Sequence, residues 1–146
     1  MYLEIKNICK TIGSAEILKH INLEMERGKI YGLRGKNGSG KTMLMRTICG
    51  LILPTEGKIV IDGETLGKDI SFPRSIGALI ENPGFIADYS GMKNLEVLAS
   101  IQNHIKKEDI AACMEELGLD PNDKKKFKKY SLGMKQKLGI IAAVME

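Results

Sequence analysis

The sequence contains no long hydrophobic segment. Its longest uninterrupted apolar run lies near residues 140–145, far short of the about 20 residues that a membrane-spanning helix needs. Residues 3–6 alternate apolar and charged side chains, a pattern unlike the continuous apolar region of a signal peptide. From these absences we expect neither an integral membrane protein nor a secreted mini-protein.

Cysteine and histidine are scarce, and neither shows the spacing of a metal site. The three cysteines, Cys9, Cys49 and Cys113, include no CxxC pair. This pattern indicates reduced thiols in a cytoplasmic protein, each filling a small apolar space. The two histidines, His20 and His104, lie far apart in the sequence, so the spacing predicts no zinc site.

The positive charge is confined to one short segment. The formal net charge is +4, but without five clustered lysines 17 basic side chains would face 18 acidic ones. Such a local cluster is not the broad basic face of a nucleic-acid-binding protein, so no nucleic acid is expected as a partner. The segment forms a solvated turn, or it meets an acidic partner or an anionic surface. The five lysines are Lys124, Lys125, Lys126, Lys128 and Lys129.

The composition is that of one globular domain with alternating β and α patterns. The 146 residues are 43% hydrophobic and 27% charged, and glycine, at 16 residues, is frequent. Alternating apolar residues predict strands, and apolar residues at helical spacing predict helices. The predicted strands cover residues 3–8, 17–25, 29–33, 58–61 and 75–80, with a hairpin turn at 62–63. The predicted helices cover 41–49, 92–103, 108–117 and the residues after 131.

Residues 35–42 match the phosphate-binding pattern G-x-x-x-x-G-K-[ST] at every position. Glycines allow such a loop to turn its N–H groups towards phosphate oxygens. Lys41 would bring a cation to the β- and γ-phosphates, and the hydroxyl of Thr42 would ligate Mg²⁺. Position between a predicted strand and a predicted helix favours a P-loop (Walker A) over a plain glycine-rich turn. The loop comprises Gly35, Lys36, Asn37, Gly38, Ser39, Gly40, Lys41 and Thr42.

Three segments together resemble the ATP-binding subunit of an ABC transporter. They are residues 32–42, 55–63 and 130–139, and the resemblance covers the whole chain in the family's order. The sequence is most similar to the bacitracin-resistance and lantibiotic-immunity branch. The place of the family's LSGGQ signature is held by Ser131, Leu132, Gly133 and Met134. Residues 76–85 also resemble that branch, with Glu81 where the Q-loop usually has glutamine.

The resemblance implies an α/β fold of the P-loop NTPase type. It divides the chain into a β-rich nucleotide-binding core (1–81), a small helical subdomain (82–133) and a signature helix returning to the core (134–146). Independently of the resemblance, Ser131 is a good helix N-cap, which predicts an anion-favouring helix terminus at the signature. By resemblance, Glu81 contacts Mg²⁺ or the attacking water.

The resemblance also implies an activity and partners. The protein would bind Mg-ATP and hydrolyse it to drive export of a drug or peptide antibiotic. Two subunits, identical or paired, would hold each ATP between one P-loop and the partner's signature. Membrane subunits would keep the protein on the inner face of the cell membrane, in the cytoplasm.

Two departures from the family pattern qualify these expectations. Ile12 stands where the family usually stacks an aromatic residue on adenine, which affects base selectivity. The sequence also ends within the signature helix, before the Walker B aspartate, the catalytic glutamate and the switch histidine. We therefore expect a truncated chain with no catalytic base, which is not competent alone.

Two other functions remain open at this stage. The first is a regulator that binds ATP without turning it over. The second is a P-loop kinase of small molecules, which uses arginines to clamp the transferred group and leaves the signature segment unexplained. The sequence has only four arginines, Arg27, Arg34, Arg46 and Arg74.

Overall fold

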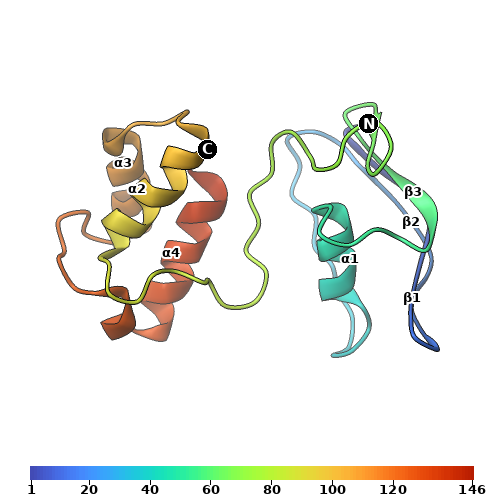
Figure 1. Cartoon of the computed structure of the whole chain (residues 1–146), viewed down its shortest axis with the longest axis horizontal. Coiled ribbons are helices and arrows are strands. Elements are labelled where there is room, and N and C mark those ends of the chain that lie inside the picture. Colours follow the sequence, from blue (N-terminus) through green and yellow to red (C-terminus); the bar gives the residue numbers. More distant parts are fainter. The chain divides into compact units, whose positions relative to one another are not determined.

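The computed structural model describes all residues, 1–146, as two compact units, Met1–Ile76 and Gly77–Glu146 (Figure 1). Each unit has its own cluster of buried hydrophobic side chains. The predicted functional subdivision into residues 1–81, 82–133 and 134–146 stays a prediction. None of the helices has the length and apolar character that crossing a bilayer requires.

The first unit is built on an antiparallel sheet with the strand order β2-β1-β3-β4. Its strands are β1 (Leu3–Ile12), β2 (Ala15–Met25), β3 (Glu56–Ile61) and β4 (Glu64–Thr65). The predicted hairpin between β3 and β4 is confirmed. Its two turn residues, Asp62 and Gly63, have φ of 50° and 86°, the positive values that a type I′ turn requires at both central positions.

A bulge in β1 keeps its apolar side chains on the core face. The register with both neighbouring strands shifts after Ile5 and Lys6, and Asn7 takes a positive φ of 53°. Ile8, rather than Asn7, is therefore buried beside Ile5. The facing residue in β3 is Gly57, where a Cβ atom would overlap the backbone of Lys6 and Asn7.

Helix α1 (Lys41–Ile48) packs its apolar residues into the core of this sheet. Leu44 is buried and Ile48 packs against the same cluster. Burying one such side chain fully contributes about 1.5–3 kcal/mol, so this packing fixes where the helix begins relative to the sheet. The predicted helix over 41–49 is confirmed. The buried members of the cluster are Leu3, Ile5, Ile8, Leu18, Leu44, Ile59, Ile61 and Leu66.

Two predicted strands are wrong. Neither 29–33 nor 75–80 forms a strand, and Ile30 is fully exposed. A short apolar run becomes a strand only where a neighbouring strand takes up its backbone hydrogen bonds. No segment of the chain pairs with either run.

The second unit consists of helices α2 (Gly91–Gln102), α3 (Lys107–Glu116) and α4 (Leu132–Val144), with a 3₁₀ turn η1 (Phe127–Lys129) before α4. All three predicted helices are confirmed. Gly118 follows α3 with φ of 73° and ends it, as its position predicted. The buried core comprises Met92, Leu95, Ala99, Ile110, Met114, Leu119, Phe127, Tyr130, Leu138, Ile141 and Met145.

Candidate functional site

The phosphate-loop residues 35–42 form a tight turn that leads into α1. Gly38 and Gly40 have φ of 79° and 89°, a region that L side chains rarely adopt. A Cβ atom on Gly40 would lie 2.9 Å from the carbonyl oxygen of Ile17 in β2. The loop can therefore lie this close to the sheet only with glycine at position 40.

The ammonium group of Lys41 is held inside the curve of the loop. Its Nζ donates to the carbonyl oxygen of Gly35 at 2.6 Å and to that of Lys36 at 2.8 Å. The backbone N–H of Ser39 also donates to the Lys36 carbonyl oxygen, at 3.2 Å. These contacts hold one positive charge inside the loop, and its partners are backbone carbonyl oxygens rather than a carboxylate.

A hollow of about 340 Å³ lies over this loop, lined by Ile17 and residues 37–43. Such a volume suits a small-molecule ligand. Helix α1 begins at its floor, and Gly40 at the N-cap offers no side-chain acceptor to the first N–H groups of the helix. Free helix N–H groups, a lysine and a glycine-lined wall together fit a phosphate chain.

Of the eight predicted loop residues, 37–42 line the hollow, and Gly35 and Lys36 contact Lys41. Their contacts with nucleotide stay a prediction. Thr42, the predicted Mg²⁺ ligand, lines the hollow from the first turn of α1. A hydroxyl oxygen beside a phosphate site is an oxygen ligand of the kind that Mg²⁺ binds. Ile12, at the end of β1, is about half exposed.

Glu81, the other predicted metal contact, belongs to the second unit. It is exposed and has φ of 64°, an uncommon value for a non-glycine residue. Because Thr42 belongs to the first unit, their joint contact with Mg²⁺ stays a prediction.

The segment that carries Glu81 lies against helix α4. A Cβ atom on Gly77 would overlap the backbone of Ala143, and one on Gly139 would lie 2.8 Å from Cδ1 of Leu79. The absence of side chains at both glycines allows the extended segment and the helix to approach this closely. Pro83 also faces Gly139, at 3.4 Å from the same Cβ position.

The predicted signature residues form the first turn of α4. Ser131 is its N-cap, and the Ser131 hydroxyl accepts a hydrogen bond from the backbone N–H of Met134 at 3.2 Å. Leu132 is 72% exposed, and a Cβ atom on Gly133 would meet only the Ser131 hydroxyl, at 4.0 Å. The prediction of Ser131 as a helix cap is confirmed, and this open turn offers backbone to a ligand or a partner.

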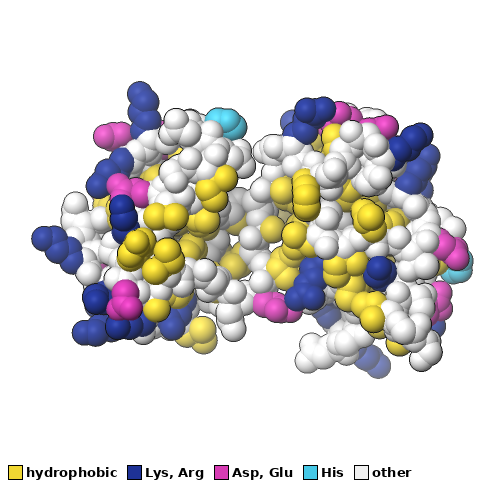
Figure 2. All heavy atoms as spheres, viewed as in Figure 1, with side chains coloured by type: hydrophobic (Ala, Val, Ile, Leu, Met, Phe, Trp, Pro, Cys, Tyr) yellow, Lys and Arg dark blue, Asp and Glu magenta, His cyan; other side chains and the backbone are white.

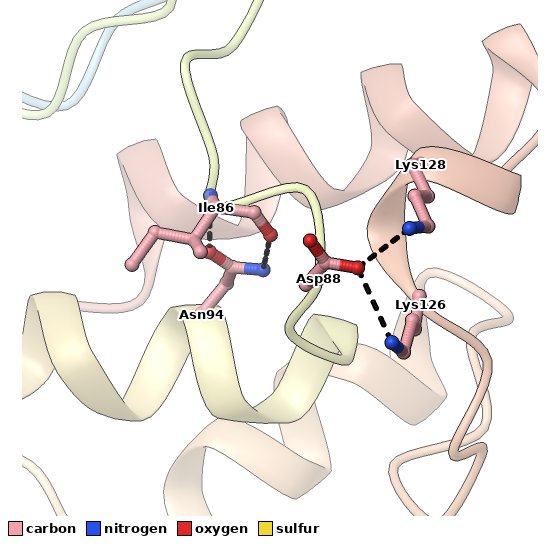
Figure 3. Close-up of polar contacts among 5 residues, drawn as sticks. All are labelled: Ile86, Asp88, Asn94, Lys126 and Lys128. Atoms are coloured by element: carbon pink, nitrogen blue, oxygen red, sulfur yellow. Dashed lines mark hydrogen bonds and ion pairs between the residues drawn. The ribbon is translucent and has the colours of Figure 1, made fainter.

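Sequence reasoning missed the contacts that hold residues 86–90, the segment before α2. Asn94, buried in α2, accepts from the N–H of Ile86 at 2.8 Å and donates to the Ile86 carbonyl oxygen at 3.1 Å (Figure 3). It also donates to the carbonyl oxygen of Ser90 at 3.1 Å. The N–H of Phe127 donates to the Tyr89 carbonyl oxygen at 2.8 Å. The Asn94 bonds tie residues 86–90 to α2, and the Phe127 bond ties them to the chain that enters α4.

Asp88 adds an ion-pair cluster to the same place. Its Oδ1 lies 2.6 Å from Nζ of Lys128 and 3.2 Å from Nζ of Lys126 (Figure 3). The hydrogen bond from Lys128, and then that from Lys126, holds the pKa of Asp88 below its ordinary value. All five clustered lysines are exposed. Figure 2 shows basic side chains gathered at the lower left, over the part of this unit that precedes α4.

Tyr130 anchors the start of the signature segment in the core. It is buried, and its hydroxyl touches Gly91 at the beginning of α2, where a side chain would collide with it. Burial raises the pKa of the Tyr130 hydroxyl. The segment that resembles the family includes Tyr130, but no sequence pattern indicated its contact with Gly91 or the hydrogen bonds of Asn94.

The loop, its helix and the hollow above them define a protein of the P-loop nucleotide-binding class. The model of the family described as "ABC transporter" matches residues 18–146, so the chain belongs to the ABC transporter family. A solved structure described as the "ATP binding subunit of ABC transporter" is similar with a TM-score of 0.85 and 25% identity. The match covers 99% of this chain and 62% of that one. The predicted α/β P-loop fold is confirmed.

Curated relatives support the same family. The uncharacterized ABC transporter ATP-binding protein YybJ of Bacillus subtilis is 46% identical, over 99% of this chain and 66% of its own length. The bacitracin transport ATP-binding protein BcrA of Enterococcus faecalis is 39% identical, over 98% and 47%. Relatives named for bacitracin and lantibiotic transport confirm the predicted branch. The chain thus spans about half to two-thirds of the length of these relatives.

Proposed function

We propose that this protein is the ATP-binding subunit of an ABC exporter and binds Mg-ATP through residues 35–42. The observation that carries the proposal is the loop itself. Its glycines, the Lys41 ammonium and the uncapped start of α1 surround one hollow of about 340 Å³. All three features attract a polyphosphate, and family membership makes ATP the expected one.

Each group has a distinct task in this proposal. The loop N–H groups and the α1 terminus hold the phosphate chain, and Lys41 exchanges the carbonyl oxygens of Gly35 and Lys36 for phosphate oxygens. The Thr42 hydroxyl would hold Mg²⁺, which neutralises phosphate charge when bound. Glu81 contributes a carboxylate to the metal or to the attacking water.

The signature turn acts on a second subunit. Ser131, Leu132 and Gly133 are exposed at the start of α4, where the helix dipole favours an anion. We propose that this turn closes over ATP held by the P-loop of a paired subunit, identical or related. One chain then contributes to two ATP sites, and hydrolysis requires the pair.

The transported substrate is proposed from the relatives. BcrA is a bacitracin transport protein and SrtF of Streptococcus pyogenes a lantibiotic transport protein, so we propose a drug or a peptide antibiotic. Membrane subunits would form the path for the substrate and hold this protein at the inner face of the membrane.

The experiment compares Lys41→Ala with Lys36→Ala in the full-length protein, with ATP binding and phosphate release measured for both. Lys36 occupies a variable position of the motif, and only its backbone oxygen contacts Lys41. We expect Lys41→Ala to lower phosphate release by about 10²-fold or more, as removal of a transition-state charge contact does. Lys36→Ala should behave like the wild type.

Three outcomes separate the alternatives. Wild-type turnover in Lys41→Ala contradicts the site assignment. ATP binding without turnover in the wild type, even with membrane subunits present, supports the non-catalytic regulator instead. Transfer of phosphate to a small acceptor supports the kinase.

A further inference from the structure

Three potential metal ligands meet on the β1–β2 hairpin, and none of them is a residue predicted to contact Mg²⁺. Cys9 in β1 and Glu16 and His20 in β2 each offer one ligand atom, and these three atoms lie within 4.8 Å of one another. Cys9 is buried, whereas Glu16 and His20 are exposed. The cluster thus has a fixed thiol at its base and two side chains that solvent can reach.

The irregular pairing of the two strands creates this cluster. The β1–β2 register shifts between Ile8 and Lys10, opposite a β2 residue, His20, that has φ of 45°. The backbone N–H of His20 donates to Sγ of Cys9 at 3.3 Å. This contact turns the sulfur towards the His20 backbone, next to the imidazole of the same residue.

The distance between the sulfur and the imidazole already suits a tetrahedral metal ion. Sγ of Cys9 lies 3.6 Å from Nδ1 of His20. Around zinc, with bonds of about 2.3 Å to sulfur and about 2.0–2.1 Å to nitrogen, a tetrahedral angle separates these two atoms by about 3.6 Å. An ion can therefore bridge them without any change in their separation.

We propose that Cys9, His20 and Glu16 bind a divalent transition metal of the zinc class. Thiolate, imidazole and carboxylate suit Zn²⁺ or Co²⁺, whereas Mg²⁺ and Ca²⁺ prefer sites made only of oxygen. The ion takes Sγ of Cys9, Nδ1 of His20 and one carboxylate oxygen of Glu16, and water completes the tetrahedron. The thiol releases its proton to solvent on binding.

Two existing contacts must give way, and both are exposed to solvent. Nδ1 of His20 lies 2.8 Å from Oδ1 of Asn7, and Glu16 lies 3.5 Å from Nζ of Lys19. When the metal takes Nδ1, the proton of the neutral ring resides on Nε2 and the Asn7 contact is lost. Exposed pairs such as Glu16–Lys19 stabilise little, so a metal ion outcompetes them.

The position of the cluster gives such an ion a structural effect. Ile17, the residue after Glu16, lines the hollow over the phosphate loop, and its carbonyl oxygen faces Gly40. A metal bound by Glu16 and Cys9 would therefore fix β2 to β1 at the wall of that hollow. The inference does not depend on which nucleotide the hollow binds.

The experiment titrates Co²⁺ into the full-length reduced protein without nucleotide and records the thiolate-to-cobalt charge-transfer absorption. The hydroxyl and carboxylate ligands predicted for Mg²⁺ cannot produce this band, so it reports a cysteine site alone. The variants are Cys9→Ser, His20→Gln and Glu16→Gln. The chain supplies matched controls outside the cluster, Cys49→Ser, Cys113→Ser and His104→Gln.

We expect saturation at one Co²⁺ per chain, displacement by Zn²⁺ and no competition from Mg²⁺. Cys9→Ser should abolish the band, and His20→Gln should weaken Co²⁺ binding at least tenfold, with Glu16→Gln in the same direction. The three controls should titrate like the wild type.

Several results would overturn the proposal. These are the absence of a thiolate band, a band that survives Cys9→Ser, or loss of the band in a control variant. If Cys9→Ser fails to fold, the exposed His20 decides the matter, because unchanged affinity in His20→Gln refutes the site.

Discussion

Removing the Asn94 carboxamide should destabilise the helical unit measurably. The side chain is 3% exposed and makes three hydrogen bonds, at 2.8, 3.1 and 3.1 Å. At about 1 kcal/mol net for each bond, their sum is about 3 kcal/mol. Ile86 is 47% exposed, so water replaces part of what its backbone loses. For Asn94→Ala we therefore expect a loss of about 2–3 kcal/mol.

The measurement is the free energy of unfolding in urea, followed by circular dichroism at 222 nm or by hydrogen exchange at the Ile86 amide. Asn94→Asp provides a second test, because a carboxylate can accept from Ile86 but cannot donate to the two carbonyl oxygens. It should be no better than alanine.

The matched control is Asn122→Ala. Asn122 is exposed, and its hydrogen bond to Asp120 uses the backbone N–H, which alanine retains. A surface substitution of this kind changes stability by less than about 0.5 kcal/mol. If Asn94→Ala also stays within that range, the three hydrogen bonds do not hold residues 86–90, and the reasoning fails.

Two further predictions concern the signature and the ion-pair cluster. The Cβ atom added by Gly133→Ala would lie in open space, and alanine gains up to about 1 kcal/mol in helix propensity, so the stability of the variant should stay level or rise. Its phosphate release should nevertheless fall, and wild-type turnover would contradict the proposed contact with a partner's ATP. The pKa of Asp88 is lowered in the folded protein, so its ion pairs stabilise above the unfolded pKa of about 4, and this contribution is lost as the pH falls through the folded value. The melting temperature of Asp88→Asn should therefore be lower than that of the wild type at pH 7, and the difference should disappear in acid.

Helices whose apolar residues recur at helical spacing were predictable from the sequence. Helices α2, α3 and α4 carry apolar residues at helical spacing, and Ser131 and Gly118 mark a start and an end by their backbone preferences. The runs 29–33 and 75–80 are apolar but form no strand. Strand formation depends on a partner, which local sequence does not specify.

The same limit applies to the candidate sites. A phosphate loop is contiguous, so its residues could be assigned directly from the motif. Cys9 and His20 instead meet only because β1 and β2 pair with a register shift, and sequence spacing therefore predicted no zinc site. Asn94 likewise gains its role from Ile86, which no local pattern connects to it.

The close approach of the Glu81 segment to α4 sets limits on mutational tolerance that solvent exposure does not reveal. Gly77 is exposed, yet any side chain there meets the backbone of Ala143, which cannot rotate away. Gly139 is buried and faces Leu79. A saturation scan should find position 77 restricted to glycine and position 139 tolerant of alanine, because the Leu79 side chain can rotate away. A Cβ atom on Gly84, in the same segment, would have no neighbour within 4 Å, so this position should accept substitutions. Position 84, not 77, is therefore the place for a spectroscopic label that reports on this segment.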